Sequence, residues 1–393
     1  MLHYPSRALY IFKISKRFYI HIYAFCRSVV QFRRVSWCMI LLILCISFLT
    51  GCNQPLLPSP VSTPTVQANH PASLQEFPLS SAFTPGAVAL DGQGNLWFAE
   101  SDGNLTTKIA QMTSNGVLHE YPLPTPQALV SHLTLGADHT IWFTEYVLDE
   151  PNNKIGKITP EGVVSEFLIP DGHIPQAITA TANGDLWFAE PNAIGCLTLQ
   201  GDVQEYPLPP QTGNPQAIAA GADGNLWFTE IGHIGQITPT GTLHEYPLEN
   251  DELPTFINAS SDGTIWFADI PTANHPAYIG YIDKERKVTQ ISQQHTQIND
   301  ITSGPDGKLW FTEAPLDISA STTIIGKISR MTTDGTTNTI TFANRLPEKI
   351  IQTSTGKIWF TEQTFNPQKA KKGATHKLYK IGLLEDLTIE HYQ

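Results

Sequence analysis

The chain has 393 residues, of which 41% are hydrophobic, 10% aromatic and 15% charged. This abundance of aromatic residues, with so few charges, excludes an intrinsically disordered protein. The formal net charge is −12, although residues 1–51 contain seven basic residues and no acidic one. The rest of the chain is therefore strongly acidic and lacks the basic face that nucleic-acid phosphates require, so we expect no nucleic-acid partner.

The first 51 residues have the layout of an export signal. Arg33 and Arg34 precede an apolar run over 37–49, which is too short to span a bilayer comfortably. The sequence Leu-Thr-Gly-Cys at 49–52 resembles the lipobox of bacterial lipoproteins, and this resemblance implies that Cys52 becomes the first mature residue and carries a lipid. A plain signal peptide or a short anchor is the alternative. We expect an extracytoplasmic monomer, held at the cell membrane through the lipid on Cys52.

Residues 52–71 form a tether between this signal sequence and the repeats. Residues 53–71 contain five prolines and no charged side chain, a composition typical of an extended spacer. Beyond the tether the only cysteine is Cys196, which excludes a disulfide framework. We expect Cys196 to be a small buried hydrophobic residue.

A Trp-Phe pair recurs seven times after residue 71 and accounts for every tryptophan outside the leader. Successive pairs are 39 to 49 residues apart, a period typical of repeat architectures. The tryptophans of these pairs are Trp97, Trp142, Trp187, Trp227, Trp266, Trp310 and Trp359. The pattern therefore indicates that the chain beyond the tether consists of seven copies of one unit.

The fullest copy, residues 215–248, divides into four short apolar runs. Asp223-Gly224 separates the first run from the second, and Thr240-Gly241 separates the third from the fourth. Short apolar runs broken by such pairs are typical of antiparallel strands joined by tight hairpins. Four strands per unit and seven units predict an all-β fold, a seven-bladed β-propeller over residues 72–393.

Two features predict how the blades pack and close. We expect each Trp and Phe of a second strand to pack against a neighbouring blade, because one four-stranded sheet cannot bury both faces alone. Residues 74–79 already have the pattern of a fourth strand before the first blade, and we predict that they complete blade seven; residues 387–392 are the alternative. Prolines in the fourth strand suit only an outer edge: Pro78, Pro122, Pro207 and Pro247.

The unit contains Pro-Xaa-Ala-Ile, Asp-Gly-Asn-Leu-Trp-Phe-Thr-Glu, Ile-Gly-Xaa-Ile-Thr-Pro and Glu-Tyr-Pro-Leu-Pro. In these motifs, over residues 74–393, the sequence resembles the virginiamycin B lyase family. The resemblance implies a propeller that opens cyclic streptogramin antibiotics by an elimination with the help of Mg²⁺. It also implies catalytic histidines and metal-binding glutamates on the ring face where first strands begin and second strands end.

The family's positions carry different residues here. The blade-six histidine corresponds to Asn299, the Glu-Pro-His of blade seven to 346–348, which reads Leu-Pro-Glu, and the final glutamate to Gln363. Asn and Leu cannot take a proton, as the base of an elimination must. We therefore favour a non-catalytic module that binds a small molecule, peptide or glycan at the tunnel entrance. The candidate ligand-binding residues are Gln176, Gln216, Asn299, Glu348 and Gln363.

The alternative is an Mg²⁺-dependent lyase or lactone-opening enzyme that acts on streptogramin-like cyclic esters. In this enzyme Glu348 would be a base or a metal ligand in its own right. Glu313 and Glu362 are then the candidate metal ligands. They belong to a set of acids that end the second strand of every blade: Glu100, Glu145, Glu190, Glu230, Asp269, Glu313 and Glu362. These acids either attract a cation or, as we favour because they recur in every blade, accept backbone N–H groups at their own turns.

The connections that follow the second strands vary most in length, and we expect them to carry recognition. The longest are 314–323 in blade six and 363–376 in blade seven. Lysines gather in and just after the second of these, where they either meet an anionic ligand or form a solvated loop: Lys369, Lys371, Lys372 and Lys377. We expect His132, one step inside the first strand of blade two, to be a core or tunnel residue.

Overall fold

The computed structural model describes residues 67–68, 74–80, 83–102, 107–148, 153–169, 172–198, 200–209, 214–249, 254–272, 276–293, 296–316, 323–365 and 377–385. These residues belong to one compact unit, 62–393. The expected signal sequence, with Cys52, lies outside the described residues, as does nearly all of the expected tether. No helix within the described ranges is long and apolar enough to cross a membrane.

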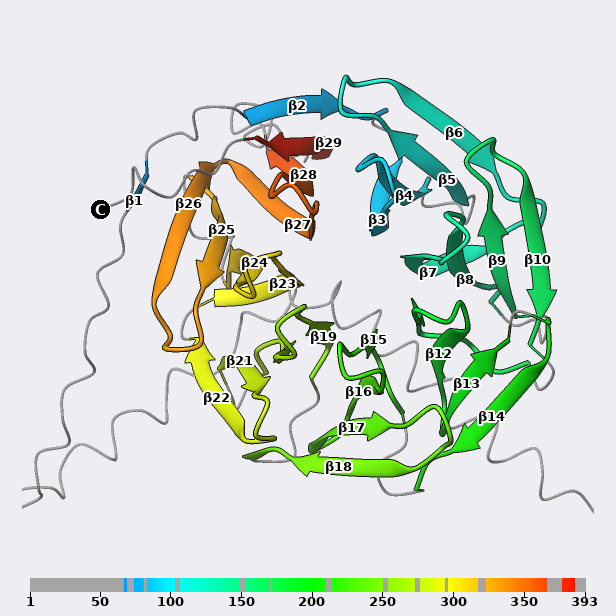
Figure 1. Cartoon of the computed structure of the whole chain (residues 1–393). Coiled ribbons are helices and arrows are strands. Elements are labelled where there is room, and N and C mark those ends of the chain that lie inside the picture. The colour runs from blue at the N-terminus through cyan, green and yellow to red at the C-terminus, as the bar shows by residue number, and fades with distance from the viewer. Residues whose placement is uncertain are drawn as a thin grey trace, which may run out of the picture. The chain divides into compact units, whose positions relative to one another are not determined.

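Seven four-stranded antiparallel units surround a central axis, as the repeat predicts (Figure 1). Five of them are separate sheets, whereas blades six and seven join into one nine-stranded sheet through a parallel pairing of Ile325 with Arg345, together with a short extra strand. The innermost strands are β3 (Thr84–Leu90), β7 (Leu129–Leu135), β11 (Ala177–Ala180), β15 (Ile218–Ala220), β19 (Phe256–Ala259), β23 (Thr296–Ser303) and β27 (Arg345–Gln352). The second strands are β4 (Leu96–Ser101), β8 (Ile141–Tyr146), β12 (Leu186–Glu190), β16 (Leu226–Glu230), β20 (Ile265–Ala268), β24 (Leu309–Pro315) and β28 (Ile358–Phe365).

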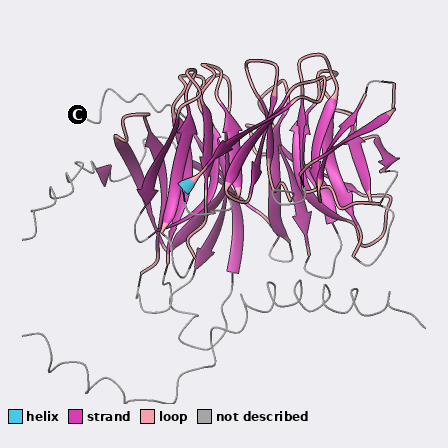
Figure 2. Ribbon diagram, turned by 90° about the horizontal axis from the view of Figure 1, so that it is seen from below, coloured by secondary structure: helices cyan, strands magenta, loops and turns pink. Residues whose placement is uncertain are grey.

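The outer half of each blade follows the same order. The third strands are β5 (Thr107–Met112), β9 (Lys154–Ile158), β13 (Ala193–Leu197), β17 (His233–Ile237), β21 (Ala277–Ile282), β25 (Ile325–Met331) and β29 (Lys377–Leu384). The fourth strands are β6 (Leu118–Pro122), β10 (Val164–Leu168), β14 (Val203–Pro207), β18 (Leu243–Pro247), β22 (Val288–Gln293), β26 (Thr337–Ala343) and β2 (Leu74–Pro78). The strands run between the two faces of the ring (Figure 2), and a short strand β1 (Gln67–Ala68) pairs parallel with β26.

The ring closes through β2, which pairs antiparallel with β29 and supplies the fourth strand of blade seven. The register runs from Leu74 opposite Leu384 to Pro78 opposite Lys380. The predicted closure by residues 74–79 is therefore confirmed, while 387–392 lie outside the described residues. Pro78, Pro122, Pro207 and Pro247 are exposed ends of outermost strands, as expected for residues that lack a backbone donor.

The tryptophans hold neighbouring blades together. Trp227 of blade four packs in one buried cluster with Phe267 of blade five, and Trp359 of blade seven packs with Phe98 of blade one. The other five interfaces contain the same Trp-to-Phe contact between successive blades. Each blade therefore buries its large aromatic residues only when the next blade is present, which is why the repeat must close on itself.

Local features fix the orientation of these rings. The indole N–H of Trp97 donates to Asp91 at the preceding turn, with 3.0 Å between the two heavy atoms, and the indole stacks on Tyr121 of the outer strand. In five blades the third strand carries glycine opposite the Phe ring, whereas blades one and six carry Ala110 and Ser329 there. In blade four a Cβ added to Gly235 would stand 2.3 Å from the Phe228 ring, so a larger residue requires the ring to shift.

Candidate functional site

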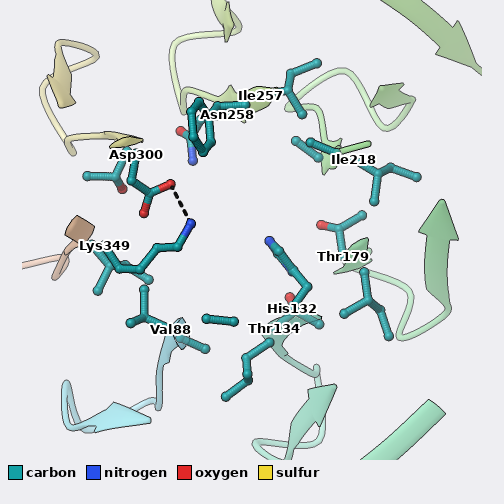
Figure 3. A pocket seen from close by; sticks show the side chains of 18 of the residues that line it. Val88, His132, Thr134, Thr179, Ile218, Ile257, Asn258, Asp300 and Lys349 are labelled. Atoms are coloured by element: carbon teal, nitrogen blue, oxygen red, sulfur yellow. Dashed lines mark ion pairs between the residues drawn. The ribbon is translucent and has the colours of Figure 1, made fainter. Parts of the chain in front are cut away.

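The innermost strands of all seven blades line a cavity of about 460 Å³ along the central axis (Figure 3). This volume falls within the range of about 300–1,000 Å³ that is usual for small-molecule sites. Apolar side chains such as Val88, Ile218 and Ile257 form much of the wall, and His132, Asp300 and Lys349 interrupt it with charged or titratable groups. The cavity is thus a tunnel with both apolar and polar groups in its wall.

β-Bulges decide which side chains reach this cavity. The pairing of the innermost with the second strand shifts register in blades one, two, six and seven, as between Ile298 and Asp300 and between Pro347 and Ile350. A bulge leaves an extra residue unpaired and redirects the side chains beside it. Asp300 and Lys349 line the tunnel as a result.

Asp300 and Lys349 form an ion pair inside the tunnel, with 3.8 Å between Lys349 Nζ and Asp300 Oδ1. The Ile350 backbone N–H donates to Asp300 Oδ2 at 3.0 Å, and Lys349 Nζ also lies 5.4 Å from the centre of the Phe256 ring. Burial raises the pKa of Asp300, and the charge of Lys349 opposes that rise. The ammonium is held by one carboxylate and one aromatic face and still borders the cavity.

His132 points toward the tunnel axis from blade two (Figure 3). Burial lowers its pKa to about 4, with the nearby charge of Lys349 as the second cause. The imidazole is therefore neutral at pH 7, and its Nδ1 makes no hydrogen bond within the described part of the chain. A neutral imidazole and an ammonium on one cavity can both bind a polar group of a ligand. The expectation that His132 is a tunnel residue is confirmed.

The predicted ligand-binding residues fall into two groups. Gln176 and Gln216 line the cavity. Asn299, Glu348 and Gln363 are not among its lining residues in the described structure. The Asn299 amide donates to the Pro347 carbonyl at 2.9 Å, and the Gln363 amide donates to the Tyr379 hydroxyl at 3.1 Å. Sequence reasoning missed Asp300 and Lys349, which directly follow Asn299 and Glu348; their charge next to the strand entrance was the available signal.

The acids at the ends of the second strands are all buried, none with more than 6% of its surface exposed. We expected them to accept backbone N–H groups. This is wrong for Glu145 and Glu362, because neither carboxylate has a hydrogen-bond partner in the described part of the chain. Glu313 accepts a hydrogen bond from Ser329, with Lys327 Nζ 4.0 Å away. Glu100, Glu145 and Glu362 instead face a second glutamate on the outermost strand: Glu120, Glu166 and Glu76 respectively.

These carboxyl pairs have strongly perturbed titration. Burial raises the pKa of Glu100 and of Glu145 to about 7, and the pKa of Glu362 to about 8. The neighbouring carboxyl adds to the rise, whereas lysine or arginine side chains oppose it. Burial beside a second carboxyl therefore favours the protonated form of Glu362.

Two other expectations concern Cys196 and the long connections. Cys196 is a free thiol, 4% exposed, in the cluster between blades three and four, and burial raises its pKa to about 12. Its expected role as a small buried residue is confirmed. In the long connections, residues 317–322 and 366–376 lie outside the described residues, and with them Lys369, Lys371 and Lys372.

The fold and the cavity define a seven-bladed β-propeller with a polar site in its central tunnel. Comparison with known proteins places it more closely, because the sequence model of the virginiamycin B lyase family matches residues 67–269 and 173–373. The chain belongs to this family.

Individual relatives agree with this assignment. A structure described as streptogramin B lyase is 31% identical, with a TM-score of 0.62 over 79% of this chain and 97% of that chain. A catalytically inactive histidine-to-alanine variant of virginiamycin B lyase from Staphylococcus aureus, with quinupristin, is 28% identical, with a TM-score of 0.60 over 80% and 99% of the two chains. Virginiamycin B lyase of Nocardia farcinica (strain IFM 10152) is 29% identical over 136 residues, which span 33% of this chain and 43% of that relative.

Proposed function

We propose that this propeller binds a small molecule, peptide or glycan at its tunnel entrance and does not catalyse the elimination for which the family is named. The observation that carries the proposal is the chemistry of the positions that correspond to the family's catalytic set. Leu346 offers no proton-transferring group, and the Asn299 amide donates to the Pro347 carbonyl. Neither side chain can serve as the base of an elimination.

The tunnel supports a binding role. Its volume of about 460 Å³ suits one small molecule or one side chain of a larger ligand, and its wall offers both apolar and polar contacts. Lys349 and His132 would orient the polar end of the ligand, and Gln176 and Gln216 line the same cavity.

Mg²⁺ does not fit the residues at the positions the family would use for it. Leu346 has no donor atom, and the Gln363 amide nitrogen donates to the Tyr379 hydroxyl. Of the two further candidates, Glu313 accepts a hydrogen bond from Ser329 and lies near Lys327, and Glu362 lies beside Glu76 and Arg345. Magnesium requires several oxygen ligands in octahedral geometry, and Leu346 offers none.

A lyase or lactone-opening enzyme is the second candidate, supported by family membership and by Glu348 at a catalytic position of the family. The test uses the full chain in detergent, incubated with quinupristin and Mg²⁺, with an EDTA-treated sample as control and ring opening followed by mass spectrometry. We expect no conversion. Conversion that Glu348→Gln abolishes would overturn the binding proposal in favour of the enzyme.

The test of ligand binding is a thermal-shift screen of small molecules, peptides and glycans against the same protein. We expect at least one class to raise the melting temperature, and Lys349→Met to diminish that shift. Lys284→Met, which removes an exposed lysine from an outer turn, is the matched control and should leave the shift unchanged. Equal shifts in both variants would show that the tunnel is not the binding site.

We also propose that lipid on Cys52 holds the propeller at the outer side of the cell membrane. The export-signal layout of residues 1–51 and the Leu-Thr-Gly-Cys sequence at 49–52 support this. Metabolic labelling with a fatty acid should mark the wild-type chain and not Cys52→Ala, which should also leave the membrane fraction. Labelling that persists in Cys52→Ala would contradict the proposal.

A further inference from the structure

Blades one and two share a construction in which an ammonium group lies beside two carboxylates. In blade two, Lys154 Nζ lies 4.0 Å from Glu145 Oε1 and 2.5 Å from Glu166 Oε2. In blade one, Lys108 Nζ lies 3.1 Å from Glu120 Oε1 beside the buried Glu100. In both blades the lysine stands directly opposite the buried acid in the strand register.

Blade three keeps both carboxylates and lacks the lysine. Glu190 ends β12 with no exposed surface, and Glu205 lies in the outermost strand β14. The residue opposite Glu190 is Ala193, whose side chain carries no charge. Blade three therefore has the same two acids as blades one and two, with alanine at the strand position where those blades carry lysine.

A histidine lies close to these two carboxylates. His173 lies in the segment before β11, with its Nδ1 3.6 Å from Glu190 Oε2, too far for a hydrogen bond. The ligand atoms of His173, Glu190 and Glu205 all lie within 4.8 Å of one another. Nδ1 is shielded from solvent and makes no hydrogen bond with any described residue. An imidazole nitrogen thus faces two carboxylates where the sibling blades hold an ammonium.

We propose that His173, Glu190 and Glu205 bind a divalent transition metal ion such as Zn²⁺. One imidazole nitrogen and two carboxylate oxygens form a ligand set typical of zinc. Metal–ligand bonds of about 2.0–2.1 Å in a tetrahedral site separate neighbouring ligand atoms by about 3.4 Å. The 3.6 Å between His173 Nδ1 and Glu190 Oε2 is already close to this separation. The dication would occupy the position of the lysine ammonium and neutralise both carboxylates, with its fourth position open to water.

The repeat supplies a variant that tests the site without removing any ligand. Ala193→Lys introduces the residue that blades one and two carry at this position, so the fold has already accommodated it there. His173→Ala removes one ligand from a segment outside the strands. His244→Ala is the matched control, because His244 is an exposed histidine on the outermost strand of blade four.

The test is titration of the metal-free full chain in detergent with Zn²⁺ by calorimetry, repeated with Co²⁺ by absorption spectroscopy. We expect one tight site in the wild type and in His244→Ala. In Ala193→Lys and His173→Ala the Kd should rise by at least about a hundredfold, since even changes outside the ligand set cost about 10–100-fold. Zn²⁺ should also raise the melting temperature of the wild type and of neither site variant.

Either of two results would overturn the proposal. The first is a wild type that binds no Zn²⁺ at 100 µM or below, which would mean that no metal ion occupies this position in blade three. The second is undiminished binding in both site variants, which would place the metal elsewhere. Neither result bears on ligand binding in the tunnel, which involves other residues.

Discussion

Replacement of Glu362 by glutamine should change how the stability of the ring depends on pH. Burial raises the pKa of Glu362 from 4.5 to about 8, the Glu76 carboxyl adds to the rise, and Arg345 and Lys380 oppose it. Between these two values the native state holds a proton that the unfolded chain has released. The free energy of unfolding of the wild type therefore falls as the pH rises from about 4.5 to about 8.

The size of the effect follows from the same linkage. One proton bound only by the native state gives a slope of about 1.4 kcal/mol per pH unit. Glu362→Gln resembles the protonated acid at every pH and removes this slope. Relative to the wild type, the variant should gain up to about 3 kcal/mol between pH 5 and 7.5, and less to the extent that Glu76 and Glu362 share their titration.

Urea unfolding of both proteins at pH 5, 6, 7 and 7.5 measures the difference directly. The other raised carboxyls, Glu100 and Glu145, contribute equally to both proteins and cancel. Glu385→Gln removes a carboxylate that pairs with Lys357 in the same blade and serves as the control for loss of one charge. A stability difference between Glu362→Gln and the wild type that stays constant across the pH series would refute the reasoning.

Three further predictions concern the packing of the blades. Gly235→Ala should destabilise the protein by at least about 1–3 kcal/mol because its Cβ would stand 2.3 Å from Phe228, whereas Gly86→Ala, whose Cβ meets nothing closer than 3.7 Å, should be tolerated in urea unfolding. Cys196 should resist an aromatic disulfide reagent in the native state and react after denaturation, because it is 4% exposed and burial raises its pKa to about 12; fast native labelling would contradict its burial. Deletion of residues 74–78 should lower the melting temperature more than deletion of 67–68, because only the former close the ring.

The sequence alone predicts the architecture of this protein in detail. Trp-Phe pairs at a regular period, Asp-Gly turns and edge prolines each have one physical use in a propeller, so the seven blades follow from them. The choice of 74–79 over 387–392 as the closing strand needs the structure. These features are local and repeat, and each copy of the unit supports the interpretation of the others.

The tunnel chemistry is harder to predict because it depends on β-bulges. Strict alternation along β23 and β27 does not show that Asp300 and Lys349 line the cavity, since one extra residue per strand redirects the side chains. The site proposed in blade three is also hard to predict from the sequence. His173 lies in a connecting segment, outside any motif. Its proposed role is recognised only when Ala193 is compared with the lysines at the same position of other blades.

The closure of blade seven affects the order in which the ring can fold during synthesis. Leu74 leaves the ribosome among the first residues of the ring and must wait for Leu384, among the last, before it can pair. Blades one to six can form in turn, but Trp359 reaches Phe98 only when the final blade arrives. A chain interrupted early therefore keeps an open first blade and an unpaired strand, which chaperones or proteases can recognise.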